Sequence, residues 1–350
     1  MKKRALSFAA IAAMVCGFAA TAAAEEELGW TINESKVITE DMTAEETAAG
    51  LKPWIFKGSG SWVDSALSVD SVTQVGSHTT LDLRKPIKRL NGTVVSIKSG
   101  YKTSVFASKT TITKVILPDN MAFSSSCQKL FQNSTGIKEI TPMFPDGMTW
   151  VPARTFEGCS ALEGDAVLNN VSSLGIWAFS KTKIRSVVMG PKCNTIGNDA
   201  FDGCTMLSNV VINATNGWST SSSTGLMFNG CTALKNFTMM TFPTTIYSTD
   251  FKSHTAKATY AANKYKICFF VPAGIADPNG LLTDGITPWA ECEQAAKDAY
   301  AARWPGAPAP LGVIKDTQAS GASYHYGTYT LPAYQFVANI PEPGFMVIVK

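Results

Sequence analysis

Hydrophobic positions recur along this chain at fixed offsets from a phenylalanine. After Phe201, apolar side chains follow at Leu207, Val210 and Ile212, with mostly polar residues between them. Side chains of a β-strand alternate between its two faces, so the pattern predicts a short strand with Val210 and Ile212 directed inward. The offsets recur, one residue shorter after Phe179, in three more segments: Ile112, Val115 and Leu117 after Phe106; Ile184, Val187 and Met189 after Phe179; Leu234, Phe237 and Met239 after Phe228.

The phenylalanines themselves form a series with a spacing of 22 to 27 residues. Its members are Phe106, Phe131, Phe156, Phe179, Phe201, Phe228 and Phe251. A period of this length with an L-x-x-L-x-L run is typical of leucine-rich-repeat units, which bury their apolar faces only by stacking on one another. The expected fold is therefore an α/β repeat solenoid with a parallel sheet on one face, N- and C-terminal caps and a small β-rich C-terminal tail.

Each repeat is expected to change direction at a glycine. A short helical or tight-turn segment carries Phe201 into the core, and Gly203 then reverses the chain because glycine adopts positive φ readily. Cys204 follows that glycine, and Cys159 and Cys231 hold the same position in their own repeats. The prediction for these three cysteines is buried, unbonded packing, with a bridge between Cys204 and Cys231 as the alternative.

The same residues carry a family resemblance. The segment Ile196-Gly197-x-x-Ala200-Phe201-x-Gly203-Cys204-Thr205-x-Leu207 resembles the BspA-like leucine-rich repeats of bacterial, and some protist, surface proteins. Residues 174–179 and 228–234 look like further copies, and 265–272 is similar to the closing strand of that family; Gly164-Asp165 departs from the pattern. The resemblance covers about half of the chain. It implies an exported protein that binds other proteins or surfaces, with no enzymatic activity in the repeats.

The N-terminus predicts export. Lys2, Lys3 and Arg4 precede an apolar stretch that ends at Ala22-Ala23-Ala24, as in a secretory signal peptide; a lipoprotein signal at Cys16 is the weaker alternative. No later run approaches the ~18 apolar residues of a membrane helix, so we expect a secreted or cell-surface protein without an integral membrane segment. The expected division is 1–24 signal peptide, 25–77 N-terminal cap region, 78–272 repeats, 273–306 C-terminal helical cap, and 307–350 linker and β-rich tail.

The C-terminal region has its own features. A helix is expected from Thr287 to Arg303, and Cys268 and Cys292, which flank this cap, form a possible disulfide. Seven of the eight cysteines survive signal removal, an odd number that leaves at least one thiol free or in an intermolecular bond. Pro341-Glu342-Pro343 resembles part of a bacterial sorting signal, but a terminal strand is the main expectation there.

Charge and motifs argue against several functions. The three positive charges of residues 1–24 equal the net charge of +3, so the mature chain is neutral. A basic cluster lacks interleaved aromatics and predicts no nucleic-acid binding; it is a solvated face or, in the sharper interpretation, a weak site for anionic glycans. Its members are Arg84, Lys85, Lys88, Arg89, Lys98 and Lys102. His78, His254 and His325 lack metal-ligand spacing, so we expect no enzyme, metal or cofactor, with an uncharacterised hydrolase using a histidine as the remaining alternative.

The outward strand positions are the candidate binding surface. We expect them to contact a protein on a host or neighbouring-cell surface. They are Lys114, Ile116, Glu139, Ser186, Val188, Asn209, Val211, Asn236 and Thr238. A glycan is the less favoured ligand because sugar-stacking aromatics are missing from these positions, although Trp177 and Trp218 at the edge remain possible platforms. The alternatives are that these polar residues only keep the sheet soluble, or that the protein is a structural cell-envelope component without a soluble ligand.

Overall fold

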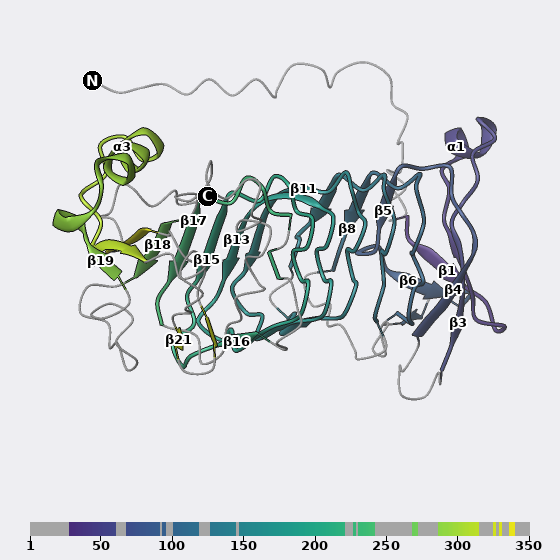
Figure 1. Ribbon diagram of the computed structural model, residues 1–350. Coiled ribbons are helices and arrows are strands. Elements are labelled where there is room, and N and C mark those ends of the chain that lie inside the picture. The colour runs from purple at the N-terminus through teal and green to yellow at the C-terminus, as the bar shows by residue number, and fades with distance from the viewer. Residues whose placement is uncertain are drawn as a thin grey trace, which may run out of the picture.

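The computed structural model describes residues 28–60, 68–91, 93–95, 101–118, 127–144, 147–220, 227–228, 230–241, 268–271, 286–314, 325–326, 329–330 and 336–339. In the described residues most of the regular structure is β-strand, and helices are short (Figure 1). The expected signal peptide, Phe251 and Pro341-Glu342-Pro343 lie outside these residues. No described helix is long and apolar enough to span a membrane.

An antiparallel sheet begins the described fold. Its strand order is β4 (Ser68–Gln74), β3 (Ile55–Ser59), β2 (Val37–Glu40), β1 (Trp30–Ile32), β6 (Ile87–Arg89) and β7 (Val94–Val95), and only β1 and β6 pair in parallel. The short helix α1 (Ala44–Ala48) starts at a capping box, in which Thr43 and Glu46 each accept the other's backbone N–H.

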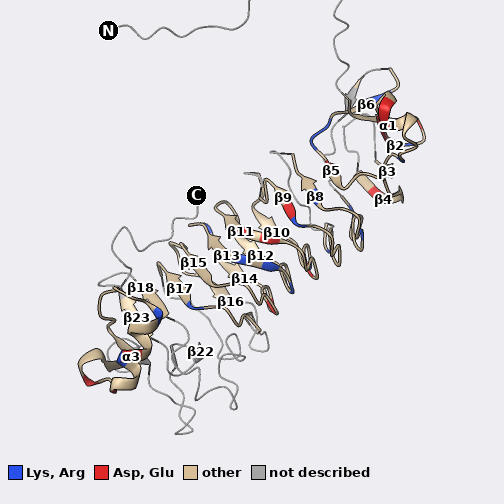
Figure 2. Ribbon diagram, turned by 90° about the horizontal axis from the view of Figure 1, so that it is seen from above, with Lys and Arg blue, Asp and Glu red and all other residues tan. Residues whose placement is uncertain are grey.

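The repeats stack as parallel strands. The first three are β5 (Thr80–Asp82), β8 (Lys114–Ile116) and β9 (Glu139–Thr141). A second run, called here the repeat sheet, contains β11 (Glu163–Leu168), β13 (Lys183–Met189), β15 (Asn209–Ile212), β17 (Asn236–Met239), β18 (Cys268–Val271) and β23 (Phe336–Asn339). Figure 2 shows these strands following one another along the molecule. The predicted parallel sheet is therefore confirmed.

A second, narrower parallel sheet runs alongside the first. It consists of two-residue strands, β10 (Trp150–Val151), β12 (Ser173–Leu174), β14 (Thr195–Ile196) and β16 (Ser219–Thr220). The sequence pattern did not reveal it, because two residues are too short for an alternation to be recognised. Val210 and Ile212 point inward as predicted, and one continuous hydrophobic cluster extends from Trp30 to Val271.

The phenylalanine series forms a stack of rings through that core. Phe106, Phe131, Phe156, Phe179, Phe201 and Phe228 are all fully buried. Successive ring centroids lie 5.6, 5.9, 5.2, 5.7 and 5.5 Å apart, with interplanar angles of at most 30°. Offset stacking at this distance favours aromatic pairs beyond simple burial. The six described members thus occupy the core as predicted.

Tight turns, not helices, carry the phenylalanines in the described repeats, which corrects the α/β expectation for this part. Five of these turns contain two residues with positive φ, and the turn after Phe228 contains Gly230 among its described residues. The position two residues after the phenylalanine is glycine in three repeats, Gly158, Gly203 and Gly230, as predicted for Gly203, but Ser108, Asn133 and Lys181 in others. The position two residues before it holds Ser104, Lys129, Arg154, Trp177 and Asp199. No glycine marks this second position, so the sequence pattern does not predict it.

Another pair of glycines has a different role. A Cβ on Gly175 would lie 2.4 Å from the backbone nitrogen of Ala153, and one on Gly197 would lie 2.6 Å from the carbonyl carbon of Gly175. The backbones of neighbouring repeats are therefore in direct contact here. These two glycines are required by the contact between repeats and not by their own φ.

The C-terminal part extends the repeat sheet at one end. β20 (Gly312–Ile314) pairs antiparallel with β23, and β19 (Ile286–Pro288) pairs with β20. A 3-10 turn (Trp289–Glu291) and α3 (Gln294–Arg303) follow β19, so the predicted helix exists but Thr287 and Pro288 belong to a strand. A hairpin of β21 (His325–Tyr326) and β22 (Tyr329–Thr330) is also described. The domain boundaries proposed from the sequence stay predictions.

Candidate functional site on the outer face of the repeat sheet

Two rows of side chains form the surface of the repeat sheet that points away from the core. We call this surface the outer face. In register, the first row is Asp165, Ser186, Asn209 and Asn236, and the second is Val167, Val188, Val211 and Thr238. The alternation of the strands places the core residues Val187, Val210 and Phe237 between these rows, facing inward. The predicted candidates that are thus brought together are Ser186, Val188, Asn209, Val211, Asn236 and Thr238.

The remaining candidates lie on the three-stranded sheet. Lys114 and Glu139 are neighbours in register, and Lys114 Nζ lies 2.9 Å from Glu139 Oε1. Hydrogen bonds from Thr141 and Lys114 lower the pKa of Glu139, so this carboxylate is ionised at neutral pH. Ile116 also lies on β8, half-buried between Val115 and Leu117 of the core. Charges on this part of the surface are therefore mutually compensated.

An amide network crosses the first row. Asn236 Nδ2 donates to Asn209 Oδ1 at 2.6 Å, and Asn209 Nδ2 donates to Ser208 Oγ at 2.9 Å. The indole Nε1 of Trp304 donates to Asn236 Oδ1 at 2.7 Å, from the end of α3. Trp304 therefore bounds the accessible part of the outer face. The sequence did not predict this contact, because 68 residues separate the two partners.

Asp165 and Val167 belong to the outer face although the sequence pattern did not predict them. The register of β11 against β13 shifts between Gly164 and Asp165, and Gly164 has a φ of 99°. This bulge moves the inward positions one residue along, to Ala166 and Leu168, and so explains the departure at Gly164-Asp165. Ser186 Oγ donates to Asp165 Oδ1 at 2.6 Å, and the side chain of Ser186 is only 4% exposed. Ser186 is therefore almost inaccessible to a ligand, and its hydrogen bond holds the Asp165 side chain in place.

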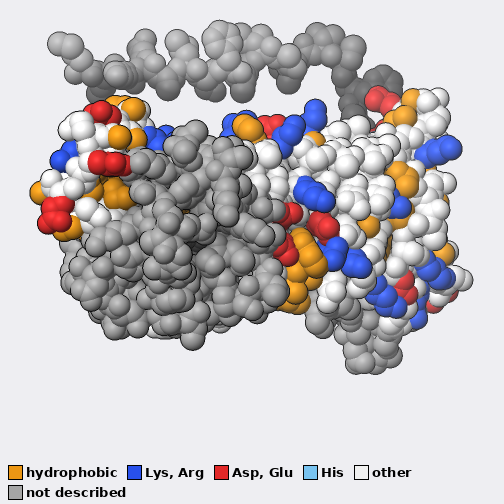
Figure 3. Space-filling view, in the orientation of Figure 1, with side chains coloured by type: hydrophobic (Ala, Val, Ile, Leu, Met, Phe, Trp, Pro, Cys, Tyr) orange, Lys and Arg blue, Asp and Glu red, His pale blue; other side chains and the backbone are white. Residues whose placement is uncertain are grey.

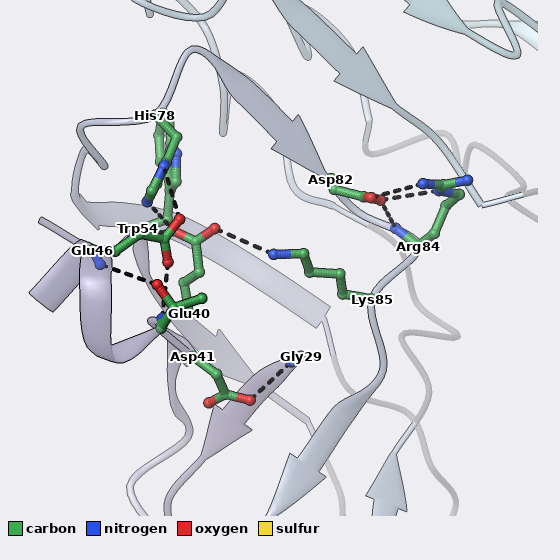
Figure 4. Close-up of polar contacts among 10 residues, drawn as sticks. Gly29, Glu40, Asp41, Glu46, Trp54, His78, Asp82, Arg84 and Lys85 are labelled. Atoms are coloured by element: carbon green, nitrogen blue, oxygen red, sulfur yellow. Dashed lines mark hydrogen bonds and ion pairs between the residues drawn. The ribbon is translucent and has the colours of Figure 1, made fainter. Parts of the chain in front are cut away.

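The basic cluster predicted near the first strands is largely neutralised. Arg84 pairs with Asp82 at 2.9 Å, Arg89 with Glu34 at 2.8 Å, and Lys102 with Asp70 at 3.0 Å. Lys85 lies 3.8 Å from Glu40, as Figure 4 shows, and Lys98 is outside the described residues. Figure 3 likewise shows basic and acidic side chains intermixed over the described N-terminal half of the view. The structure gives the sharper interpretation, a site for anionic glycans, no support.

His78 lies between two carboxylates. Its Nε2 is 3.8 Å from Glu40 Oε2 and its Nδ1 is 3.7 Å from Glu46 Oε1, with Glu40 also accepting the backbone N–H of Trp54 at 3.1 Å (Figure 4). Both distances exceed that of a hydrogen bond, and both carboxylates belong to the first sheet or its helix. His254 lies outside the described residues, and His325 belongs to β21. Among the described residues, no group of three or more His, Cys, Asp or Glu side chains could hold a metal ion.

The two tryptophans considered as sugar platforms are both engaged. Trp218 is 1% exposed, and its Nε1 donates to the carbonyl oxygen of Thr241 at 3.2 Å. The guanidinium carbon of Arg154 lies 3.9 Å from the ring centroid of Trp177, so a cation occupies one face of that ring. Trp218 is thereby excluded as a stacking platform, and Trp177 presents at most one face.

The seven cysteines among the described residues are buried, unbonded thiols. Burial raises the pKa of Cys159, Cys193 and Cys204 to about 12, which leaves them protonated and unreactive at neutral pH. The possible Cys268–Cys292 disulfide is not formed; Cys292 Sγ instead donates to the carbonyl oxygen of Pro288 at 3.3 Å. The unbonded packing predicted for the repeat cysteines is the arrangement observed.

Comparison with known structures finds several leucine-rich repeat proteins at low identity. A leucine-rich repeat protein from Bacteroides ovatus is 17% identical with a TM-score of 0.44, over 53% of this chain and 47% of that one. The T. pallidum leucine-rich repeat protein is 18% identical with a TM-score of 0.42, over 61% and 94%. A leucine-rich cell surface protein from Faecalibacterium prausnitzii is 14% identical with a TM-score of 0.27, over 53% and 68%. The chain thus spans about half the length of the Bacteroides ovatus protein.

The repeat sequence itself gives the family. No curated protein matches the chain. Residues 89–208 and 124–257 match the BspA type leucine rich repeat region, in six copies. These residues are the ones that build the phenylalanine stack and most strands of the repeat sheet. Residues 89–257 are therefore a BspA-type leucine-rich repeat region.

Proposed function

We propose that this is an exported surface or secreted protein that binds another protein through the outer face of the repeat sheet, in adhesion or recognition. BspA-type repeats are of a bacterial surface type, generally mediate protein interactions and are typically non-enzymatic scaffolds. The observation that carries the proposal is the pair of rows on β11 to β17, in which polar groups lie beside partly exposed valines. Mixed polar and apolar surface of this kind suits a protein partner.

Export rests on the N-terminal sequence. The basic residues, apolar stretch and small residues of 1–24 fit a secretory signal peptide. The partner is then a protein on a host or neighbouring-cell surface. A glycan is disfavoured because Trp218 is buried and one ring face of Trp177 is covered by Arg154.

The experiment is capture of surface proteins by the chain without residues 1–24. We expect Val211→Arg to abolish capture, because a charged side chain would stand in the middle of the outer face. Thr195→Arg, at the first position of β14 on the narrow sheet, is the matched control and should capture as the unaltered chain does. Capture that survives Val211→Arg in a folded protein would refute the binding face.

A structural cell-envelope role is the second candidate. It also fits the predicted export. In that case the protein would fractionate only with detergent-resistant surface material, and neither substitution would alter its distribution.

A further inference from the structure

The molecule already docks a helix on part of the outer face. Cys268 and Phe270 of β18 stand in register with Asn236 and Thr238, so their side chains point to the same side of the sheet. Together with Phe336 and Ala338 of β23 they form a hydrophobic cluster with Ala296, Tyr300 and Trp304 of the α3 segment. The ring centroids of Tyr300 and Phe336 are 4.9 Å apart, and those of Trp304 and Phe336 are 5.6 Å apart. α3 thus packs its apolar side across the ends of both rows (Figure 1).

Among the described residues, the second row continues beyond α3 without that cover. Under the helix, Phe270 is 8% and Ala338 is 4% exposed. Farther along the same row Val167 is 37% exposed, and Val188, Val211 and Thr238 are partly exposed. One apolar row is therefore buried by a helix at one end and left open over the next strands. The open part of the row is mostly apolar, like the covered part, but its side chains are smaller.

The open part accommodates a helix and not an added strand. The backbones of β13, β15 and β17 are hydrogen-bonded to neighbouring strands on both sides, so an extended peptide finds no free edge there. Strands lie about 4.8 Å apart and a helix is about 10 Å wide, so one helix spans roughly two strands. A helix laid next to α3 would therefore lie over β15 and β17 and reach β13, with Trp304 at its border.

Charge adds one more requirement. Asp165 is exposed and forms no ion pair with the described residues, its contact being the hydroxyl of Ser186. The adjacent Glu163 is paired with Arg185 at 2.9 Å. A ligand helix that reaches the first strand of the surface would gain from a cation opposite Asp165.

We propose that the outer face over β13, β15 and β17 docks an amphipathic helix of the partner protein, parallel or antiparallel to α3 and beside it. The helix places small aliphatic side chains on Val188, Val211 and Thr238 and a Lys or Arg toward Asp165. The partner's helix packs on the sheet as α3 does, so that two helices lie side by side on the outer face. This inference rests on the proposed function and specifies the partner element that the outer face receives.

The test uses a phage-displayed library of random 16-residue peptides, selected on the chain without residues 1–24. Enriched peptides should show apolar residues at i, i+3 or i+4 and i+7 with a Lys or Arg, and their synthetic forms should gain helical circular dichroism on binding. Val211→Asp should weaken these peptides at least tenfold and Asp165→Asn severalfold, while Thr195→Asp should leave binding unchanged. Thermal melts of each variant establish that it is folded.

The outcomes separate the two proposals. Failure to enrich any peptide, enrichment of peptides without helical periodicity, or helical peptides that ignore Val211→Asp would each overturn helix docking. If surface-protein capture still depends on Val211 in those cases, the proposed function stands and only the helical nature of the ligand is wrong. If capture is independent of Val211 as well, both are wrong.

Discussion

The thiol of Cys159 donates a hydrogen bond of 3.1 Å to the carbonyl oxygen of Phe131, one repeat earlier. The same relationship joins Cys204 to Phe179 and Cys231 to Phe201, each at 3.1 Å. In the preceding repeat Ser134 Oγ donates to Phe106 at 2.7 Å from the equivalent position. In these four repeats, the residue three places after the repeat's own phenylalanine therefore links that repeat to the backbone of the one before.

This linkage predicts how the cysteine position tolerates substitution. Cys159→Ser should cost under about 1 kcal/mol in the free energy of unfolding, because a hydroxyl can donate to Phe131 as Ser134 does to Phe106. Cys159→Ala should cost more, about 1–2 kcal/mol, since it removes the donor and leaves a small void. Urea unfolding of the two variants measures the difference. Equal destabilisation by both would show that packing alone matters here.

Buried thiols predict a loss of stability at alkaline pH. Burial raises the pKa of Cys159, Cys193 and Cys204 from 9.0 to about 12. The folded pKa exceeds the unfolded one, so this contribution is complete below pH 9 and is lost as the pH rises toward 12. The loss per thiol is at most about 1.4 kcal/mol per pH unit. Unfolding free energies measured between pH 8 and 11 should fall less steeply for Cys204→Ala than for the unaltered chain, and an unchanged slope would contradict the assignment.

Two glycines should respond differently to alanine. Gly203→Ala forces a positive φ of 72° on a residue with a Cβ, whose nearest neighbour would be the flexible Lys181 side chain at 3.3 Å, and should cost about 1 kcal/mol. Gly197→Ala drives a Cβ against the backbone of the previous repeat at 2.6 Å and should cost about 3 kcal/mol. Thermal unfolding of the two variants compares the cost of a positive φ in a turn with the cost of a steric clash between repeats. The ranking, more than either value, is the prediction.

Lys181 offers a stabilising change. It is exposed and has a φ of 60°, a conformation that glycine adopts without a steric penalty. Lys181→Gly should raise stability by about 0.5 kcal/mol, the relief of strain exceeding the entropy that glycine adds to the unfolded chain. Lys183→Gly, at an exposed position of β13, is the matched control and should destabilise. Melting temperatures that fall for both variants would argue against strain at Lys181.

The bond between Trp304 and Asn236 predicts what anchors α3. Trp304→Phe preserves an aromatic ring against Phe336 but removes the indole donor, so it should cost about 1 kcal/mol and increase amide hydrogen exchange in α3. Trp289→Phe keeps an aromatic ring near Phe336 and has no such bond to lose, so it serves as the control. Exchange in α3 that responds equally to both would mean that ring packing alone holds the helix.

The repeat architecture could be predicted from the amino-acid pattern, because the signals for it lie within single repeats. The spacing of the phenylalanines and the alternation through Val210 and Ile212 recur within one unit, so they predicted the ring stack, the inward residues and the parallel sheet. The glycine at the turn was predictable for the same reason, since a positive φ is a property of one residue.

The contacts between repeats and between distant segments could be identified only from the folded structure. Gly197 resembles any turn glycine until the backbone of the previous repeat is placed against it. The one-residue shift of the bulge hid Asp165 and Val167 from the pattern. The buried Trp218 bonds to Thr241, 23 positions away, and Trp304 bonds to Asn236, 68 positions away. Such separations leave no periodicity in the chain, so the extent of the outer face follows from packing and not from sequence.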